Sequence, residues 1–219
     1  MTLSEPDVAL TDFGLAIECA VFAGSLYWGR RGRRLRTWWI LFFGALGGGA
    51  LLGGITHGFV TDDDSALPRA LWSATLFAIG LAALACWVIG GYLLFPQRAV
   101  RQVIVVAVSL FAAYVVIILF VSASFAIAIV HYGLAGAFLL AAFMVIYRRR
   151  RQRAVLAGIA GMALSYAAAA VQQSEIAMPA LNLSHNALYH LIQAVALLLI
   201  FLAARILIRE VRCARDATS

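Results

Sequence analysis

The sequence contains no lysine, so all 17 of its basic residues are arginine. A retinal-binding protein needs a lysine amine to form its Schiff base, and this absence excludes that class of seven-helix membrane protein. Charged residues are also scarce, at 12% of the chain, whereas 64% of the residues are apolar and the mean hydropathy is +0.94. These values are typical of membrane proteins. A length of 219 residues leaves no room for a separate soluble domain, which predicts a single domain.

Cysteine and proline are scarce as well. The three cysteines, Cys19, Cys86 and Cys213, contain no pair at metal-binding or redox spacing, so we expect no disulfides. The four prolines all lie outside the apolar stretches, at positions 6, 68, 96 and 179. Transporters with interrupted helices carry prominent Pro or Gly breaks in midspan. The placement of the prolines therefore counts against a transporter.

Long apolar stretches occupy most of the chain. They cover residues 8–28, 38–59, 70–95, 103–121, 125–147, 154–174 and 186–208. Each is long enough to cross a hydrocarbon core of about 30 Å at about 1.5 Å per helical residue. Residues 103–147 form one nearly unbroken apolar run, which must fold back, and the serines at 122–124 are the best place for the turn. The pattern predicts an all-α, polytopic membrane protein built as a seven-helix bundle.

The charges are distributed unequally between the two ends of these helices. Sixteen of the 17 arginines fall in four segments that would share one side, at 30–36, 98–101, 148–153 and 205–215. The other side receives Glu5, Asp7, three aspartates at 62–64 and Glu175, with Arg69 as its only basic residue. The positive-inside rule then predicts an outside N-terminus and a cytoplasmic C-terminus, in the cell inner membrane. Arginines so close to helix ends face lipid headgroups, so membrane lipids are the expected partners and nucleic acid is not.

Glycines are concentrated in the predicted helix 38–59. They include the small-xxx-small pairs Gly49/Gly53 and Gly54/Gly58. Such pairs usually mark close helix packing, and we favour that interpretation. Glycines beside His57 would also leave space for a ligand without contributing chemistry.

Polar side chains inside the predicted helices cluster at one depth. In hydrocarbon such a group costs several kcal/mol unless it faces a partner or a cavity. Counted along the predicted helices, all four histidines fall in the outer third, together with Asp12 and the glutamines at 172 and 173, while Glu18 lies nearer the midplane. The histidines are His57, His131, His185 and His190. This shared depth predicts a common polar pocket near the outer leaflet.

The segment that opens the predicted helix 186–208 is the most polar. Asn182, Asn186, Tyr189, His190 and Gln193 are spaced to form one helical stripe, which should face the bundle interior. His185 lies about 100° round from Asn186 and about 140° from His190 in a regular helix. A less specific interpretation is that each histidine is an interfacial hydrogen-bonding residue and Tyr189 an interface anchor.

If the pocket holds a metal, histidine nitrogens with a nearby carboxylate favour zinc, whose bound water can act as a nucleophile. The preferred ligands are His57, His131 and His190, with His185 able to replace any one of them. Glu18 or Asp12 would then take a proton from the water. Asn186, Tyr189, Gln193 and Gln172 would contact the substrate. A lipid amide or ester is the expected substrate at this depth.

Seven helices, His57 at the outer end of the helix 38–59 and the motif HNALYH at 185–190 resemble the superfamily of alkaline ceramidases, adiponectin and progestin receptors and hemolysin III proteins. The resemblance implies zinc-dependent lipid hydrolysis, with one histidine from the second helix and two from an HxxxH motif on the seventh. In that superfamily a serine usually lies four residues before the histidine of the second helix, and here that position is Gly53. At the positions of the HxxxH motif this sequence has Asn186 and His190. A closer likeness is to uncharacterised bacterial seven-helix membrane proteins with a similar motif, which implies no activity.

Three functions outside hydrolysis stay open. A haem protein would use His57 with His131 or His190 as axial ligands. A transporter or ligand sensor would use the same pocket for binding alone. A structural or assembly role would require no pocket chemistry.

Overall fold

The computed structural model describes residues 4–28, 33–60 and 66–216. This part of the chain contains seven α-helices and no β-strand, which confirms the predicted helical class. The helices are α1 (Pro6–Tyr27), α2 (Arg33–Phe59), α3 (Ala66–Leu94), α4 (Gln97–Phe120), α5 (Phe125–Arg150), α6 (Arg153–Gln173) and α7 (His185–Asp216). A single 3₁₀ turn, η1 (Pro179–Leu181), precedes α7. All seven helices are long and apolar enough to cross a membrane.

Several helices extend beyond their apolar stretches at the arginine-rich end. α2 begins at Arg33, five residues before its apolar stretch, and α4 begins at Gln97, six residues before its own. α7 continues beyond residue 208, where its apolar stretch ends. Hydropathy marks only the part of a helix that suits hydrocarbon, whereas arginine is a good helix former and lets the helix continue into water. At the opposite end the chain reverses between Phe120 and Phe125, as predicted, and the Ser124 side chain accepts a hydrogen bond from the Ala126 N–H.

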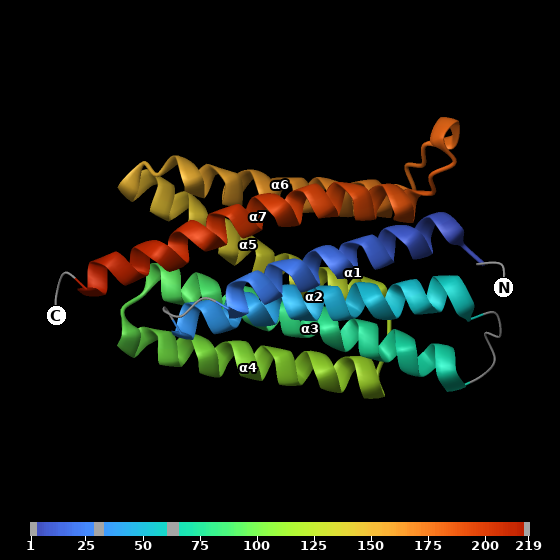
Figure 1. Cartoon of the computed structure of the whole chain (residues 1–219). Coiled ribbons are helices and arrows are strands. Elements are labelled where there is room, and N and C mark those ends of the chain that lie inside the picture. The colour runs from blue at the N-terminus through green and yellow to red at the C-terminus, as the bar shows by residue number, and fades with distance from the viewer. Residues whose placement is uncertain (1–3, 29–32, 61–65, 217–219) are drawn as a thin grey trace.

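Six of the helices form a closed ring. Neighbours along the ring are α1, α2, α3, α5, α6 and α7, and α7 packs back against α1 (Figure 1). α4 lies outside this ring and packs on α3, so α4 presents most of its surface outward. The ring therefore has an interior that side chains from six helices can reach, and this interior is where a site can form.

Aromatic side chains fill the ring interior at its arginine-rich end. Trp39, Phe42, Phe43 and Phe143 are fully buried, from α2 and α5. Phe22 of α1 and Phe201 of α7 stack with their ring centroids 4.2 Å apart and join the same core. No comparable aromatic core fills the other end of the ring among the described residues, and the cavities lie there.

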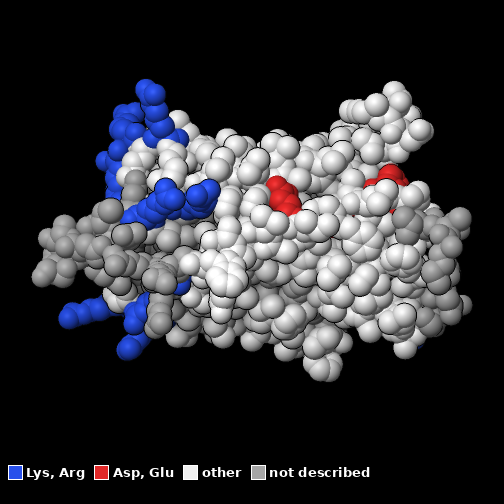
Figure 2. Space-filling view, in the orientation of Figure 1, with Lys and Arg blue, Asp and Glu red and all other residues white. Residues whose placement is uncertain are grey.

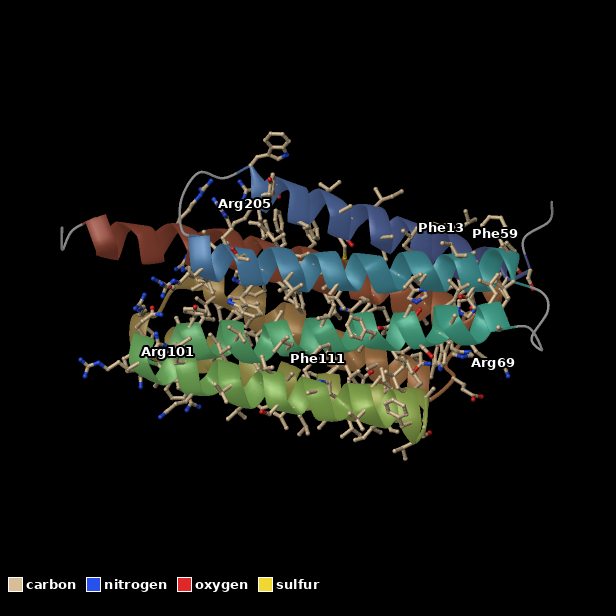
Figure 3. All side chains as sticks on the ribbon, turned by 90° about the horizontal axis from the view of Figure 1, so that it is seen from below. Phe13, Phe59, Arg69, Arg101, Phe111 and Arg205 are labelled. Atoms are coloured by element: carbon tan, nitrogen blue, oxygen red, sulfur yellow. The ribbon has the colours of Figure 1, made fainter. Side chains whose placement is uncertain are left out.

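The two ends of the molecule differ in charge. Figure 2 shows the arginine side chains of the visible face gathered at the end where the C-terminus lies. Figure 3 shows Arg101 and Arg205 at that end and Arg69 at the opposite end, where Phe13 and Phe59 also lie. Figure 1 places the two termini at opposite ends, as an odd number of spans requires. The one-sided arginine distribution read from the sequence thus holds in three dimensions.

The glycines of α2 let α1 approach closely. A Cβ added at Gly47 would lie 2.9 Å from the Cys19 Cβ, and one added at Gly54 would lie 2.8 Å from the Phe13 ring. Both distances are shorter than carbon atoms tolerate. The expected close packing of this helix is therefore present, and it brings α1 against α2 beside the cavity.

Candidate functional site

A cavity of about 270 Å³, which we call the polar cavity, lies inside the helix ring. All six ring helices contribute to its wall. Its polar lining residues are Asp12, Thr56, His57, Thr75, Tyr132, Gln172, Asn186, Tyr189, His190 and Gln193. These residues lie in the halves of their helices that are farther from the arginine-rich end. The cavity is therefore nearer the end of the molecule where the N-terminus lies.

Asp12 is the most deeply buried charged residue of the site, at 3% exposed. It reaches the cavity because α2 offers no side chain opposite it: a Cβ at Gly53 would lie 2.9 Å from Asp12 Oδ2. The other carboxylate oxygen, Oδ1, lies 3.3 Å from His190 Nε2 on α7. Gly53 therefore leaves space for the Asp12 side chain, whereas the role considered for the glycines beside His57 was to leave space for a ligand.

The two ring nitrogens of His190 contact different residues, Thr11 through Nδ1 and Asp12 through Nε2. The Thr11 hydroxyl lies 2.8 Å from the Asp7 carbonyl oxygen, 2.9 Å from that of Val8 and 3.1 Å from His190 Nδ1. The donor in the last contact depends on the imidazole tautomer, and a neutral imidazole with its hydrogen on Nε2 accepts from Thr11 at Nδ1. His190 Nε2 faces Asp12 Oδ1, and a hydrogen bond between these atoms needs one hydrogen, carried by the imidazole or by the carboxyl group.

The N-terminal segment ties the cavity mouth together. Glu5 Oε2 lies 2.6 Å from His57 Nδ1, and the Glu5 N–H donates to the His57 carbonyl oxygen at 3.1 Å. Asp7 Oδ2 accepts from the Ser184 N–H at 2.9 Å, just before α7 begins. The start of α1 therefore holds the ends of α2 and α7, the two helices that carry His57 and His190.

A second cavity of about 120 Å³, which we call the apolar cavity, adjoins the first. The two cavities share seven lining residues, among them Tyr132, Tyr189 and Gln193. Beyond this shared wall the apolar cavity is lined mainly by small and apolar residues of α5 and α6, including Gly136 and Met162. Gln193 is held toward it by donating from Nε2 to Ser165 Oγ at 3.1 Å. The ring interior thus offers a polar chamber joined to an apolar one.

Four residues of the predicted α7 stripe line the polar cavity: Asn186, Tyr189, His190 and Gln193. Asn186 Oδ1 also accepts from Gln172 Nε2 of α6 at 3.5 Å. The fifth, Asn182, lies outside the helix. It follows η1 with a φ of 52°, is exposed, and cannot continue the stripe because α7 begins at His185. The prediction that Asn182 belongs to the stripe is therefore corrected.

Three other predicted site residues line neither cavity. His131 turns away and stacks on Tyr114 of α4, with ring centroids 4.3 Å apart, while its neighbour Tyr132 lines both cavities. His185 and Glu18 are also absent from the two walls. Each of these residues lies about 100° or more round its helix from a neighbour that does face inward. Depth along a helix was therefore a sound guide to the site, but it does not say which way a side chain points.

Several residues of the site were not anticipated from the sequence. Tyr132 and Trp72 contribute aromatic surface, and Thr56 and Thr75 contribute hydroxyl groups. Both threonine hydroxyls donate to carbonyl oxygens of their own helices, at 2.9 and 3.0 Å. Thr56 directly precedes His57, and this adjacency was a usable signal. Aromatic residues in apolar helices carry no such signal, because core packing uses them equally often.

The residues present do not form a metal site as they are placed. Among the described residues no group of three His, Cys, Asp or Glu side chains is arranged to hold a metal ion. His57 and His190 line the same cavity, but each is paired with a carboxylate, Glu5 and Asp12 respectively. The arrangement offers an acid–base pair and several hydrogen-bonding groups around an open space.

Comparison with known proteins identifies the family. One family model matches residues 8–209, which is almost the whole chain, and its description is "Family of unknown function (DUF6962)". Neither the curated proteins nor the solved structures contain a match. The matched region includes α2 to α6, most of α1 and α7, and both cavities, and the chain therefore belongs to the DUF6962 family.

Proposed function

We propose that this protein is a multi-pass protein of the inner membrane that binds a small amphipathic molecule in the joined cavities. The observation that carries the proposal is the polar cavity of about 270 Å³, formed by side chains from six helices and containing the Asp12–His190 pair. Buried polar groups in a membrane protein are costly, and packing with apolar side chains would stabilise the bundle more. The cost is explained if a bound molecule uses these groups.

The orientation of the protein follows from its arginine-rich end. We place that end in the cytoplasm, by the positive-inside rule, and the cavity toward the outer leaflet. A membrane-impermeant maleimide should then label Cys213 in inverted membrane vesicles and not in right-side-out ones. Cys19 and Cys86 are buried and free, so they should not obscure the result.

Unsatisfied hydrogen-bonding capacity also supports a bound molecule. Tyr132 lines both cavities, and its hydroxyl is buried without a hydrogen-bond partner among the described residues. A buried hydroxyl left unpaired costs about 1–3 kcal/mol, so a ligand or an ordered water is expected against it. The apolar cavity beyond it would receive the hydrocarbon part of the same molecule.

Filling the polar cavity should abolish this binding. Gly49 lines it, and a Cβ there would meet ordinary contacts, with Ala78 Cβ at 3.6 Å and the Thr75 carbonyl oxygen at 3.9 Å, so the ring of the variant Gly49→Phe is expected to enter the cavity. We expect wild-type protein in nanodiscs to bind at least one of hexylamine, hexanol and hexanoate with a Kd of about 1 mM or lower by calorimetry. Gly49→Phe should lose that binding.

The matched control is Gly44→Phe on the same helix. Gly44 lines neither cavity, and a Cβ there would meet nothing within 4 Å. This variant should bind as the wild type does. Equal binding by the two phenylalanine variants, or no binding of any probe by the wild type, would refute the proposal.

Zinc-dependent hydrolysis of a lipid amide or ester is the second candidate. The observation that favours it is that His57 and His190, at two of the three positions where the resemblance to ceramidases implies metal ligands, line one cavity together with Asp12. Since these side chains are not arranged around a metal, we derive no step through one. One zinc per chain in the wild-type preparation, lost in His190→Ala, would move hydrolysis to first place.

A further inference from the structure

Asp12 is the one acidic side chain that lines either cavity, and no arginine does so, among the described residues. The other ionisable lining groups besides the tyrosines are His57 and His190. The nearest charged partner of His57 is another acid, Glu5. Phosphate and carboxylate groups are usually bound by arginine, lysine or a helix N-terminus. The lining therefore offers little to an anionic headgroup.

Aromatic rings occupy much of the polar cavity wall. Trp72, Phe125, Tyr132 and Tyr189 come from α3, α5 and α7. Trp72 is held in place because its Nε1 donates to the Ala123 carbonyl oxygen at 2.8 Å, and its ring lies 5.8 Å from that of Phe125 between centroids. The face of an aromatic ring attracts a cation, most strongly for Trp and where water is excluded. A fixed aromatic wall around one carboxylate is a common arrangement for holding an organic cation.

Asp12 supplies the matching negative charge when His190 is neutral and carries its hydrogen on Nε2. Only its Oδ1 is engaged, by His190 Nε2 at 3.3 Å, which is long for a charge-assisted hydrogen bond. Oδ2 faces Gly53, where no side chain is present, and has no hydrogen-bond partner among the described residues. An ammonium group could bind Oδ2 without displacing His190.

The size of the apolar cavity limits the rest of the molecule. An engineered apolar cavity of about 150 Å³ binds benzene, so one of about 120 Å³ can take a chain of about six carbons. It adjoins the polar cavity at a shared wall that includes Tyr132, Tyr189 and Gln193. A molecule with a cationic head and a short chain would therefore fill both spaces at once.

We propose that the ligand is a primary alkylammonium, with its head between Asp12 and the aromatic wall and its chain in the apolar cavity. This inference rests on the proposed function, because it names the class of molecule that the joined cavities bind. Alkylamines are protonated at neutral pH, as the lysine side chain is. Neutral and anionic molecules with the same chain should bind less tightly.

The test compares three probes that differ only in their heads: hexylamine, hexanol and hexanoate, titrated into wild-type protein in nanodiscs by calorimetry at neutral pH. We expect hexylamine to bind at least tenfold more tightly than either of the others. Asp12→Asn, which keeps the shape of the side chain and removes its charge, should weaken hexylamine about tenfold or more and change hexanol by less than twofold. Glu18→Gln is the matched control, because Glu18 is on the same helix and lines neither cavity.

Each outcome separates this inference from the proposed function. If hexanol binds as tightly as hexylamine, and Gly49→Phe blocks both, the cavity binds amphipathic molecules but the choice of a cation is wrong. Equal losses of hexylamine affinity in Asp12→Asn and Glu18→Gln would also overturn the inference. If Asp12→Asn fails to fold, saturating hexylamine should still raise the melting temperature of wild-type protein more than hexanol does, and the reverse order would refute the proposal.

Discussion

Phe43→Ala is expected to lower the free energy of unfolding by about 3 kcal/mol, near the lower end of the range for Phe→Ala in a buried core. Phe43 is fully buried, and its ring centroid lies 5.4 Å from that of Phe22, 5.1 Å from Phe42 and 5.9 Å from Phe201. It therefore joins helices α1, α2 and α7. In lipid the transfer of apolar groups adds little to helix association, so the loss comes mainly from packing contacts and from the cavity left behind.

Unfolding in mixed micelles, with the mole fraction of denaturing detergent as the variable, would measure this loss. Phe120→Ala provides the control, because Phe120 is 81% exposed at the end of the outer helix α4. Its removal should change the free energy of unfolding by less than about 0.5 kcal/mol. Similar losses from the two variants would contradict the assignment of Phe43 to the core of the ring.

Gly161→Ala should cost about 2 kcal/mol, a large effect for one added methyl group. The added Cβ would lie 2.6 Å from the Ala196 carbonyl oxygen and 3.0 Å from the Ile200 backbone nitrogen. Backbone atoms cannot rotate aside as a flexible side chain can, so α6 and α7 would have to separate. The separation would move Gln193 away from Ser165, and with it one wall of the apolar cavity.

Gly44→Ala is the matched substitution for this experiment. A Cβ at Gly44 meets nothing within 4 Å, and alanine favours a helix over glycine by up to about 1 kcal/mol. This variant should therefore be as stable as the wild type or slightly more stable, measured by thermal unfolding in the same detergent. If Gly44→Ala lost as much stability as Gly161→Ala, the loss would reflect a general intolerance of alanine and not a backbone contact between α6 and α7.

The number of helices and the turn at 122–124 were predictable because both depend on local composition. A membrane span needs a certain length of apolar sequence, and charged or hydroxyl-bearing residues end it. The limits of α2, α4 and α7 were less predictable, since arginines continue those helices beyond the hydrocarbon core. The orientation in the membrane is a prediction of the same local kind, and the labelling of Cys213 tests it.

The candidate site was predictable only in part. His57 and His190 were singled out by depth, and both line the polar cavity. His131 was singled out by the same argument but stacks on Tyr114, because α4 lies beside α5 on that face. Tyr132, the next residue, faces the cavity instead. Which of two adjacent residues points inward depends on the neighbours of the helix, and the sequence does not name them.

Composition and spacing along the chain determined that this protein has seven long apolar helices and that its arginines gather at one end. They also determined that most of its polar side chains lie at a similar position along those helices, because each helical residue advances the chain by a constant rise of about 1.5 Å. Only the tertiary structure decided that six helices close a ring and that α4 stays outside it. The same packing brings Asp12, from the first helix, to His190 on the last through the space left at Gly53. Contacts between distant segments depend on how side chains of many helices fit together, and no local pattern records that fit.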